Sequence, residues 1–175
     1  MEKIYETAYA KINLGLDVLG KRSDGYHEVR MVMQSVGLSD AVEIEEGEGL
    51  VVETDHSGLA GGPDNLAWKA AELLARCCGK IPNVHIRLNK KIFLAAGLAG
   101  GSSDAAAVMR GLSRLWQLDL TAPELEKLAA ELGSDIPFCI TGGTALAEGR
   151  GEILTELPEA PELLLVLARS EASRP

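Results

Sequence analysis

Apolar and polar residues alternate near the start of the chain with the period of two that is typical of a β-strand. Between residues 8 and 18, one face of this strand is apolar and the other carries polar or small residues. The apolar face consists of Ile12, Leu14, Leu16 and Val18, and the opposite face of Lys11, Asn13, Gly15 and Asp17. Similar patterns predict strands over residues 29–38, 41–45, 50–54 and 83–89. The first half of the chain is therefore expected to build most of a sheet.

Helical spacing of apolar residues, with start and stop signals, follows in the second half. The predicted helices run from Asp64 or Asn65 to about Cys78, over residues 103–117, and from a capping box at Thr121–Glu124 to Gly133. Strands are expected to close the chain over residues 144–147, 152–157 and 163–168. This order of strands and helices predicts an α+β fold.

Composition narrows the class of partner. The chain has 175 residues, of which 46% are hydrophobic and 25% are charged, as in ordinary globular domains. A formal net charge of −9 argues against nucleic acid, because its phosphates would be repelled overall. The three cysteines match neither a disulfide framework nor a zinc spacing. No signal peptide or membrane-spanning run is visible, so we expect a cytoplasmic protein with a small-molecule partner and leave its oligomeric state open.

A run of small residues precedes the second predicted helix. Residues 97–103 contain three glycines and two serines, and an alanine-rich pattern follows at once. A backbone with few Cβ atoms can approach a ligand closely, and a helix start offers unpaired N–H groups. These features suit a phosphate site, although the run matches neither the P-loop nor the G-x-G-x-x-G pattern. A tight turn is the alternative. The hydroxyls of Ser102 and Ser103 could bind phosphate oxygens or help hold Mg²⁺, and one of them could cap the helix as well.

An amine, an amide and a carboxylate are candidates for chemistry. Lys11 and Asn13 project from the same strand face, about 7 Å apart. Asp135 precedes the apolar residues 136–140, which we interpret, with Cys139, as core. If Lys11 lies close by, the pairing would keep Asp135 ionised and able to act as a base. The alternatives are a solvated strand face and an ordinary turn aspartate.

A predicted turn, Asp24-Gly25-Tyr26-His27, places an aromatic ring beside an imidazole. A nucleobase could stack on Tyr26 and hydrogen-bond to His27 or to its backbone. The alternative is a surface hairpin without a ligand. The turn is therefore a candidate for nucleobase binding, but the pattern does not decide it.

Four blocks of the sequence, in this order, resemble the GHMP kinases, a superfamily of small-molecule kinases. The blocks are Ala10–Leu14, Gly20–His27, Ala96–Ala106 and Gly133–Phe138. The glycine-serine block is common to the superfamily, whereas the second block is particular to members that act on a cytidine-bearing sugar alcohol. The resemblance spans essentially residues 4–170. It implies a ribosomal-protein-S5-like α+β fold, that of the GHMP kinase N-terminal domain.

The resemblance implies transfer of the γ-phosphoryl group of ATP, with Mg²⁺, to the 2-hydroxyl of a methylerythritol unit carried on cytidine diphosphate, in non-mevalonate isoprenoid biosynthesis. It implies that Asp135 takes the hydroxyl proton and that Lys11 orients it and steadies developing charge. Asn13 would contact the methylerythritol, and Tyr26 and His27 the cytosine. The residues implied to bind ATP are Asn65 and Lys90 near the adenine, and Phe93, Leu94, Ala95, Ala96, Gly97, Leu98, Ala99, Gly100, Gly101, Ser102 and Ser103 around the phosphates. No residue is implied as a metal ligand.

Two features depart from the family pattern. Phe93 stands where the family usually has proline, at the turn from strand to loop. The family also continues into a second α/β domain. Residues 1–165 are therefore expected to form the N-terminal domain, and residues 166–175 the start of a truncated C-terminal region. The alternative to an active kinase is a domain that binds nucleotide or substrate with little or no turnover.

Overall fold

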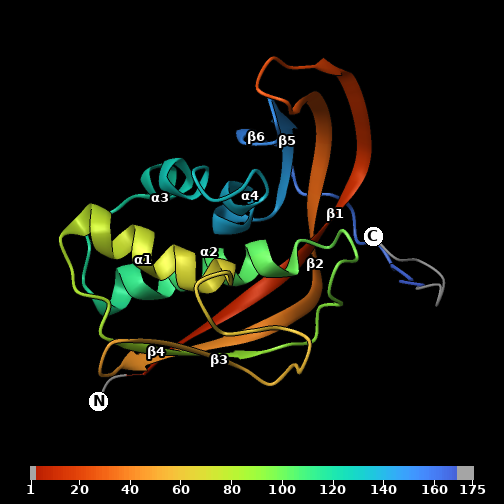
Figure 1. Cartoon of the computed structure of the whole chain (residues 1–175). Helices are drawn as coiled ribbons and strands as arrows, with labels where there is room; N and C mark the ends of the chain where they lie inside the picture. The colour runs from red at the N-terminus through yellow and green to blue at the C-terminus, as the bar shows by residue number, and fades with distance from the viewer. Residues whose placement is uncertain (1–2, 169–175) are drawn as a thin grey trace.

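A long central strand, β2 (His27–Glu46), organises a six-stranded sheet in the computed structural model, which describes residues 3–168 (Figure 1). The other strands are β1 (Lys3–Lys21), β3 (Leu50–Thr54), β4 (Val84–Asn89), β5 (Thr144–Glu148) and β6 (Ile153–Glu156). β1 runs antiparallel along one edge of β2. The other edge is shared, since residues 41–46 pair with β4 and residues 31–34 pair with β5. The two halves of β2 therefore belong to differently built parts of the sheet.

Helices cover one side of this sheet. They are α1 (Leu66–Cys78), α2 (Gly100–Leu115), α3 (Ala122–Ala129) and α4 (Ile136–Thr141). α1 connects β3 to β4, which run parallel and so need a crossover of this kind. α1 and α2 lie over β3 and β4, whereas α4 packs toward β5 through Phe138 (Figure 1). Within residues 3–168, no helix is long and apolar enough to span a membrane.

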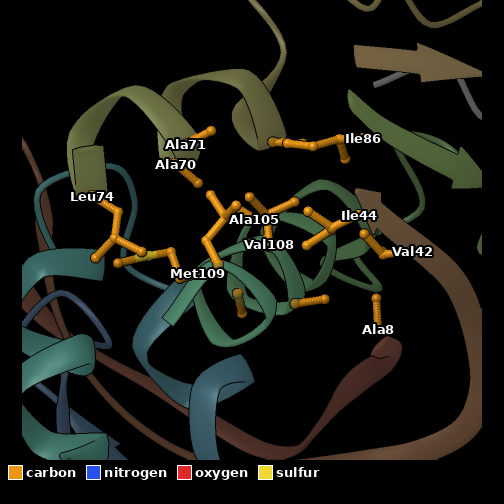
Figure 2. Packing of buried hydrophobic residues seen from close by; sticks show 14 of the residues in the cluster. Ala8, Val42, Ile44, Ala70, Ala71, Leu74, Ile86, Ala105, Val108 and Met109 are labelled. Atoms are coloured by element: carbon orange, nitrogen blue, oxygen red, sulfur yellow. The ribbon is translucent and has the colours of Figure 1, made fainter. Parts of the chain in front are cut away.

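Small residues allow α1 and α2 to approach each other and the sheet closely. Ala70 and Ala71 of α1 and Ala105 of α2 are fully buried in the main core (Figure 2). At Gly111 an added Cβ would lie 2.5 Å from Ile44 Cδ1, so α2 crosses β2 at a position without a side chain. Close packing of this kind leaves little room for α2 to tilt. The start of α2, with its glycine-rich run, is therefore held in a defined place.

The structure confirms the predicted starts of two helices, which are set by hydrogen bonds between residues close in sequence. The Asn65 side chain accepts the N–H of Ala67 at 2.9 Å and caps α1. The predicted capping box forms as well, with the Thr121 N–H donating to Glu124 at 2.8 Å. α3 ends at Ala129, somewhat before the expected glycine. Local hydrogen bonds thus set where these helices begin.

Several segments differ from the prediction. Residues 29–38 and 41–45 are parts of one continuous strand, β2, and the second helix begins at Gly100 rather than at residue 103. The apolar residues 136–140 form most of a short helix, α4. The strand predicted over residues 163–168 is wrong, because this segment has no regular structure and no strand pairing. A short apolar run becomes a strand only when a sheet edge pairs with it.

The predicted apolar face of β1 is not a core face beyond Ile12. Leu14, Leu16 and Val18 are 46%, 52% and 60% exposed. They lie on the arm formed by the far half of β1 and the start of β2, which projects from the helix-covered part (Figure 1). Three irregularities in the pairing of β1 with β2 also break the alternation that the sequence suggests. Periodicity predicted the strand but not which part of it is covered.

Candidate active site

Lys11, Asn13 and Asp135 come together at the base of the arm. The Lys11 ammonium lies 3.4 Å from the Asp135 carboxylate and donates to the Asn13 amide oxygen at 3.1 Å. The Lys11 side chain is almost fully buried, whereas a third of the Asp135 side chain is exposed. The charged pair therefore has one open side, on which a substrate hydroxyl can reach the carboxylate.

A break in the pairing of β1 explains how Lys11 reaches this position. Tyr9 pairs with Ser39, but Lys11 pairs with Ser35, so extra residues of β2 oppose β1 here. As a result Ala10 and Lys11 are both buried, although strict alternation would place them on opposite faces. Bulges often redirect a side chain in this way. The irregularity turns the amine inward to meet Asp135.

Asp135 stands immediately before α4, at its N-cap position, but its side chain makes no capping hydrogen bond. The carboxylate is therefore free to face Lys11. Arg110 of α2 fastens α4 from behind, since its guanidinium donates to the Cys139 carbonyl at 2.6 Å and to the Thr7 carbonyl at 3.0 Å. One arginine thus connects α4, which follows Asp135, to β1, which carries Lys11.

The glycine-rich loop, residues 93–103, whose last residues form the first turn of α2, is bonded to the same segment of β1. The Leu98 carbonyl accepts the N–H of Lys11 at 3.1 Å, and the Ser103 hydroxyl donates to the Tyr9 carbonyl at 2.6 Å. These bonds lie on either side of Ala10, which packs with Leu98. The structure therefore places the predicted phosphate loop directly beside the predicted catalytic lysine.

The start of α2 is open to a ligand. Ala99 is its N-cap, with a left-handed φ of 58° and no side-chain cap bond. The first N–H groups of a helix have no partner within the helix, so those of Gly100 to Ser102 are available to an anion. The alternative that a serine caps α2 is wrong. Ser103 is 1% exposed and its hydroxyl is engaged with Tyr9, whereas Ser102 is partly exposed.

Two residues expected near adenine have other partners. The Asn65 amide is used on both sides, since its oxygen caps α1 and its nitrogen donates to the Ala60 carbonyl at 2.9 Å. The Lys90 ammonium is buried between Asp40 and Asp104. Neither side chain presents its polar end to open space. A role for these residues at adenine therefore rests on their backbone atoms. Phe93, in place of the usual proline, is 45% exposed.

Tyr26 and His27 lie at the tip of the arm, and both are exposed. The turn is closed by the Arg22 N–H, which donates to the Tyr26 carbonyl at 2.8 Å. Arg150, from the turn between β5 and β6, places its guanidinium 4.9 Å from the centre of the Tyr26 ring. Sequence reasoning missed Arg150; its flanking glycines, which indicate a tight turn, were the available signal.

The turn between β5 and β6 also links the arm tip to the ion pair. A Cβ added at Gly151 would lie 3.7 Å from Cβ of Ser134, the neighbour of Asp135. Gly151 in turn follows Arg150, which covers one face of Tyr26. The turn between β5 and β6 therefore contacts both the tip of the arm and the segment that carries Asp135.

Cys139, predicted to be a core residue, is partly buried and packs against both of the larger core clusters. Its Sγ is 3.4 Å from the Ser103 hydroxyl. Burial raises the pKa of the thiol to about 11, so it is not a nucleophile near neutral pH. Among residues 3–168 there is also no group of three or more His, Cys, Asp or Glu side chains placed to hold a metal ion.

Comparisons with known proteins bear on the fold and on the family of the chain. Residues 65–143 match the family described as GHMP kinases N terminal domain. A crystal structure of 4-(cytidine 5'-diphospho)-2C-methyl-D-erythritol kinase superposes with a TM-score of 0.74 at 38% identity, covering 88% of this chain and 55% of that one. A mevalonate kinase structure, at 15% identity and a TM-score of 0.65, shares the fold.

Curated relatives point the same way. The chain is 53% identical over 163 residues to a 4-diphosphocytidyl-2-C-methyl-D-erythritol kinase of Synechococcus sp. (strain JA-3-3Ab), covering 93% of this chain and 53% of the relative. It is 49% identical over 172 residues to a protein of that name from Caldanaerobacter subterraneus subsp. tengcongensis, covering 98% and 60%. The chain thus spans just over half the length of these relatives.

Proposed function

Since the chain carries a GHMP kinase N-terminal domain, we propose that it binds ATP and transfers the γ-phosphoryl group to an alcohol. The observation that carries this proposal is the Lys11–Asp135 pair, which is bonded through β1 to the glycine-rich loop and is open on one side. Phosphoryl transfer depends mostly on positioning and charge stabilisation. A base, a cation and an anion-binding helix start within one small region supply these needs.

In the proposed reaction, the Asp135 carboxylate accepts the proton of the substrate hydroxyl as its oxygen forms a bond to the γ-phosphorus. The bond from that phosphorus to the bridging oxygen breaks, and ADP leaves. Lys11 holds Asp135 in place. Its ammonium also offsets the negative charge that builds up close to it in the transition state. The N–H groups at the start of α2 bind the ATP phosphates.

We propose that Mg²⁺ arrives with the nucleotide. Mg²⁺ in kinase sites is bound largely by phosphate oxygens and water, with few protein ligands. When bound, the ion neutralises charge on the phosphates. We assign no residue of this chain to it, because residues 3–168 provide no ready group of metal ligands.

The proposed alcohol is 4-diphosphocytidyl-2-C-methyl-D-erythritol, phosphorylated on its 2-hydroxyl in non-mevalonate isoprenoid biosynthesis. The names of the relatives support this substrate. The exposed Tyr26 ring has one face toward Arg150 and can offer the other to cytosine. His27 would hydrogen-bond the base, and Asn13, beside Lys11, would contact the methylerythritol.

The test is an ATP-consumption assay of the 175-residue chain with this alcohol, alongside calorimetric binding of ATP and of the alcohol. Turnover supports the proposal. Binding of ATP without turnover supports instead a nucleotide-binding domain that does not catalyse transfer, and absence of ATP binding contradicts both.

A tyrosine variant tests the substrate end. Tyr26→Ala should weaken binding of the cytidine alcohol about tenfold, because a stacked base loses its aromatic partner, and should leave ATP binding unchanged. Tyr5→Ala is the matched control, since Tyr5 is a similarly exposed tyrosine of β1 outside the arm. Equal loss of both ligands in Tyr26→Ala would count against the stacking role.

A further inference from the structure

Lys90, Asp40 and Asp104 form a buried charged cluster that the proposed reaction does not use. The Lys90 ammonium lies 2.5 Å from an Asp40 carboxylate oxygen and is also paired with Asp104. The three side chains are 1%, 0% and 2% exposed. Charged side chains are buried to this degree only rarely, so the cluster requires an explanation beyond chance.

The cluster connects three elements around the glycine-rich loop. Asp40 comes from β2, Lys90 follows the end of β4, and Asp104 lies in the second turn of α2. The second oxygen of Asp40 accepts the N–H groups of Lys91, at 2.5 Å, and Ile92, at 2.8 Å. These two residues lead directly into the loop. One carboxylate therefore holds both the ammonium and the first residues of the loop.

The ammonium lies immediately behind the start of α2. A Cβ added at Gly100, the first residue of the helix, would stand 3.6 Å from the Lys90 nitrogen and 3.0 Å from Ile92 Cγ2. The helix start thus rests on Lys90 and Ile92. A shift of the loop or of α2 would separate Lys90 from one of its carboxylates.

The charge of the cluster excludes a direct attraction for phosphate. Two carboxylates share one ammonium, so the ionised cluster carries a net negative charge and would repel an anion. One oxygen of Asp104 has no hydrogen-bond partner, and burial raises the pKa of this carboxyl to about 7. Apolar residues can often replace a buried ion cluster without loss of stability. What such a cluster can add is geometric specificity.

We propose that Lys90, Asp40 and Asp104 are positioning residues that fix the start of the glycine-rich loop against α2 and so set the shape of the ATP phosphate site. This inference rests on the proposed function, because it takes the loop as the ATP site. In this proposal the Lys90 side chain supports the loop from the side away from the nucleotide and does not contact adenine.

The test compares ATP affinity in variants of Asp104 by calorimetry, well below their unfolding temperatures. Asp104→Ala leaves the ammonium with one partner and opens a gap beside α2, so ATP affinity should fall at least about tenfold. Asp104→Asn keeps the shape and an acceptor oxygen for Lys90, and should restore ATP affinity to within about threefold of the unmodified chain. Affinity for the cytidine alcohol should stay unchanged in both.

A charge-matched control and a reserve variant complete the experiment. Asp55→Asn also removes a carboxylate next to Lys90, but Asp55 is exposed and accepts only the backbone N–H of Lys90. Its ATP affinity should not change. If Asp104→Ala does not fold, Asp104→Leu fills the same space without an acceptor and should show the same loss of ATP affinity.

Each result separates the two proposals. An unmodified chain that does not bind ATP contradicts the proposed function. ATP binding by the unmodified chain, together with unchanged affinity in Asp104→Ala or Asp104→Leu, overturns the positioning role. Equal losses in Asp104→Asn and Asp104→Ala also overturn it, because the negative charge and not the geometry would then matter. Loss of both ligands in Asp104→Ala would indicate general disruption and would likewise contradict it.

Discussion

Two lysine–aspartate pairs flank the glycine-rich loop, and they differ mainly in burial. Lys11 is bonded to the end of the loop through Leu98, and its partner Asp135 is one-third exposed. Lys90 stands just before the loop, and its partners Asp104 and Asp40 are almost completely buried. The residue types are the same at both sites. The tertiary surroundings of each pair are different.

The comparison shows that burial decides whether a carboxylate can react with a substrate or can only position its neighbours. A substrate can reach the open side of Asp135, so that carboxylate can accept a proton. No substrate can reach Asp104, whose charge can only hold neighbouring groups in place. The same kind of substitution should therefore affect different properties at the two sites: turnover at the open pair, and stability and ATP affinity at the buried cluster.

The largest effect is expected at the open pair. Asp135→Asn should lower phosphoryl transfer by about 10²–10⁴-fold, the usual contribution of a general base. ATP affinity and the unfolding midpoint should stay close to those of the unmodified chain, because the side chain is partly exposed and caps nothing. Steady-state kinetics and thermal unfolding check this. Turnover near the original rate would remove Asp135 as the base.

A second effect separates the pairs by stability. Lys90→Met leaves two carboxylates buried without a cation and should lower the free energy of unfolding by about 3–5 kcal/mol. Lys11→Met leaves only the partly exposed Asp135 unpaired and should cost about 1 kcal/mol or less, although it should impair turnover. Urea unfolding measures both. Similar losses of stability in the two variants would show that burial does not distinguish the pairs.

The pH dependence of stability should sharpen the comparison. Burial raises the pKa of Asp104 to about 7 in the folded chain, from an ordinary 3.8. Between these values the folded state holds a proton that the unfolded state has released, so this group's contribution to stability falls as pH rises from about 4 to 7. The difference amounts to a few kcal/mol at most. Asp104→Asn should lack this decline in unfolding experiments, and an unchanged slope would contradict the raised pKa.

The smallest effect is expected at the helix start that rests on the buried cluster. Gly100→Ala brings a Cβ to 3.0 Å from Ile92, whereas Gly101→Ala meets Leu66 at an ordinary 3.5 Å. Gly101→Ala should therefore be more stable by about 1 kcal/mol, since overpacking costs about this much. Chemical unfolding gives the difference. Equal stabilities of the two variants would show that the loop and the buried cluster can shift enough to accommodate the added methyl group.

Much of the fold followed from local patterns. Asn65 caps α1 and Thr121 opens α3 as predicted, because these hydrogen bonds join residues two or three positions apart. The nearness of Lys11 and Asp135 was predicted only as a condition, and the structure meets it. The exposed apolar face of the arm was not predicted, since alternation identifies a strand without saying what covers it.

The charged residues show the same limit. Lys90 was expected near adenine, but its ammonium pairs with Asp40, 50 positions away, and with Asp104. Neither aspartate was singled out beforehand. Ser103 was expected to bind phosphate or cap a helix, and it donates instead to Tyr9, 94 positions away. In each case the partner is distant in sequence, so no local pattern could indicate it.

The sequence by itself determined the starts of α1 and α3, most of the strands, the glycine-rich loop and the resemblance to the GHMP kinases. These features are local, because the spacing of side chains along a helix or a strand is fixed by the backbone geometry of neighbouring residues. Only the tertiary structure decided which lysine meets an open carboxylate and which is enclosed by two buried ones. Burial depends on how separate segments pack together, and it changes the free energy of a charge far more than any neighbour in sequence does.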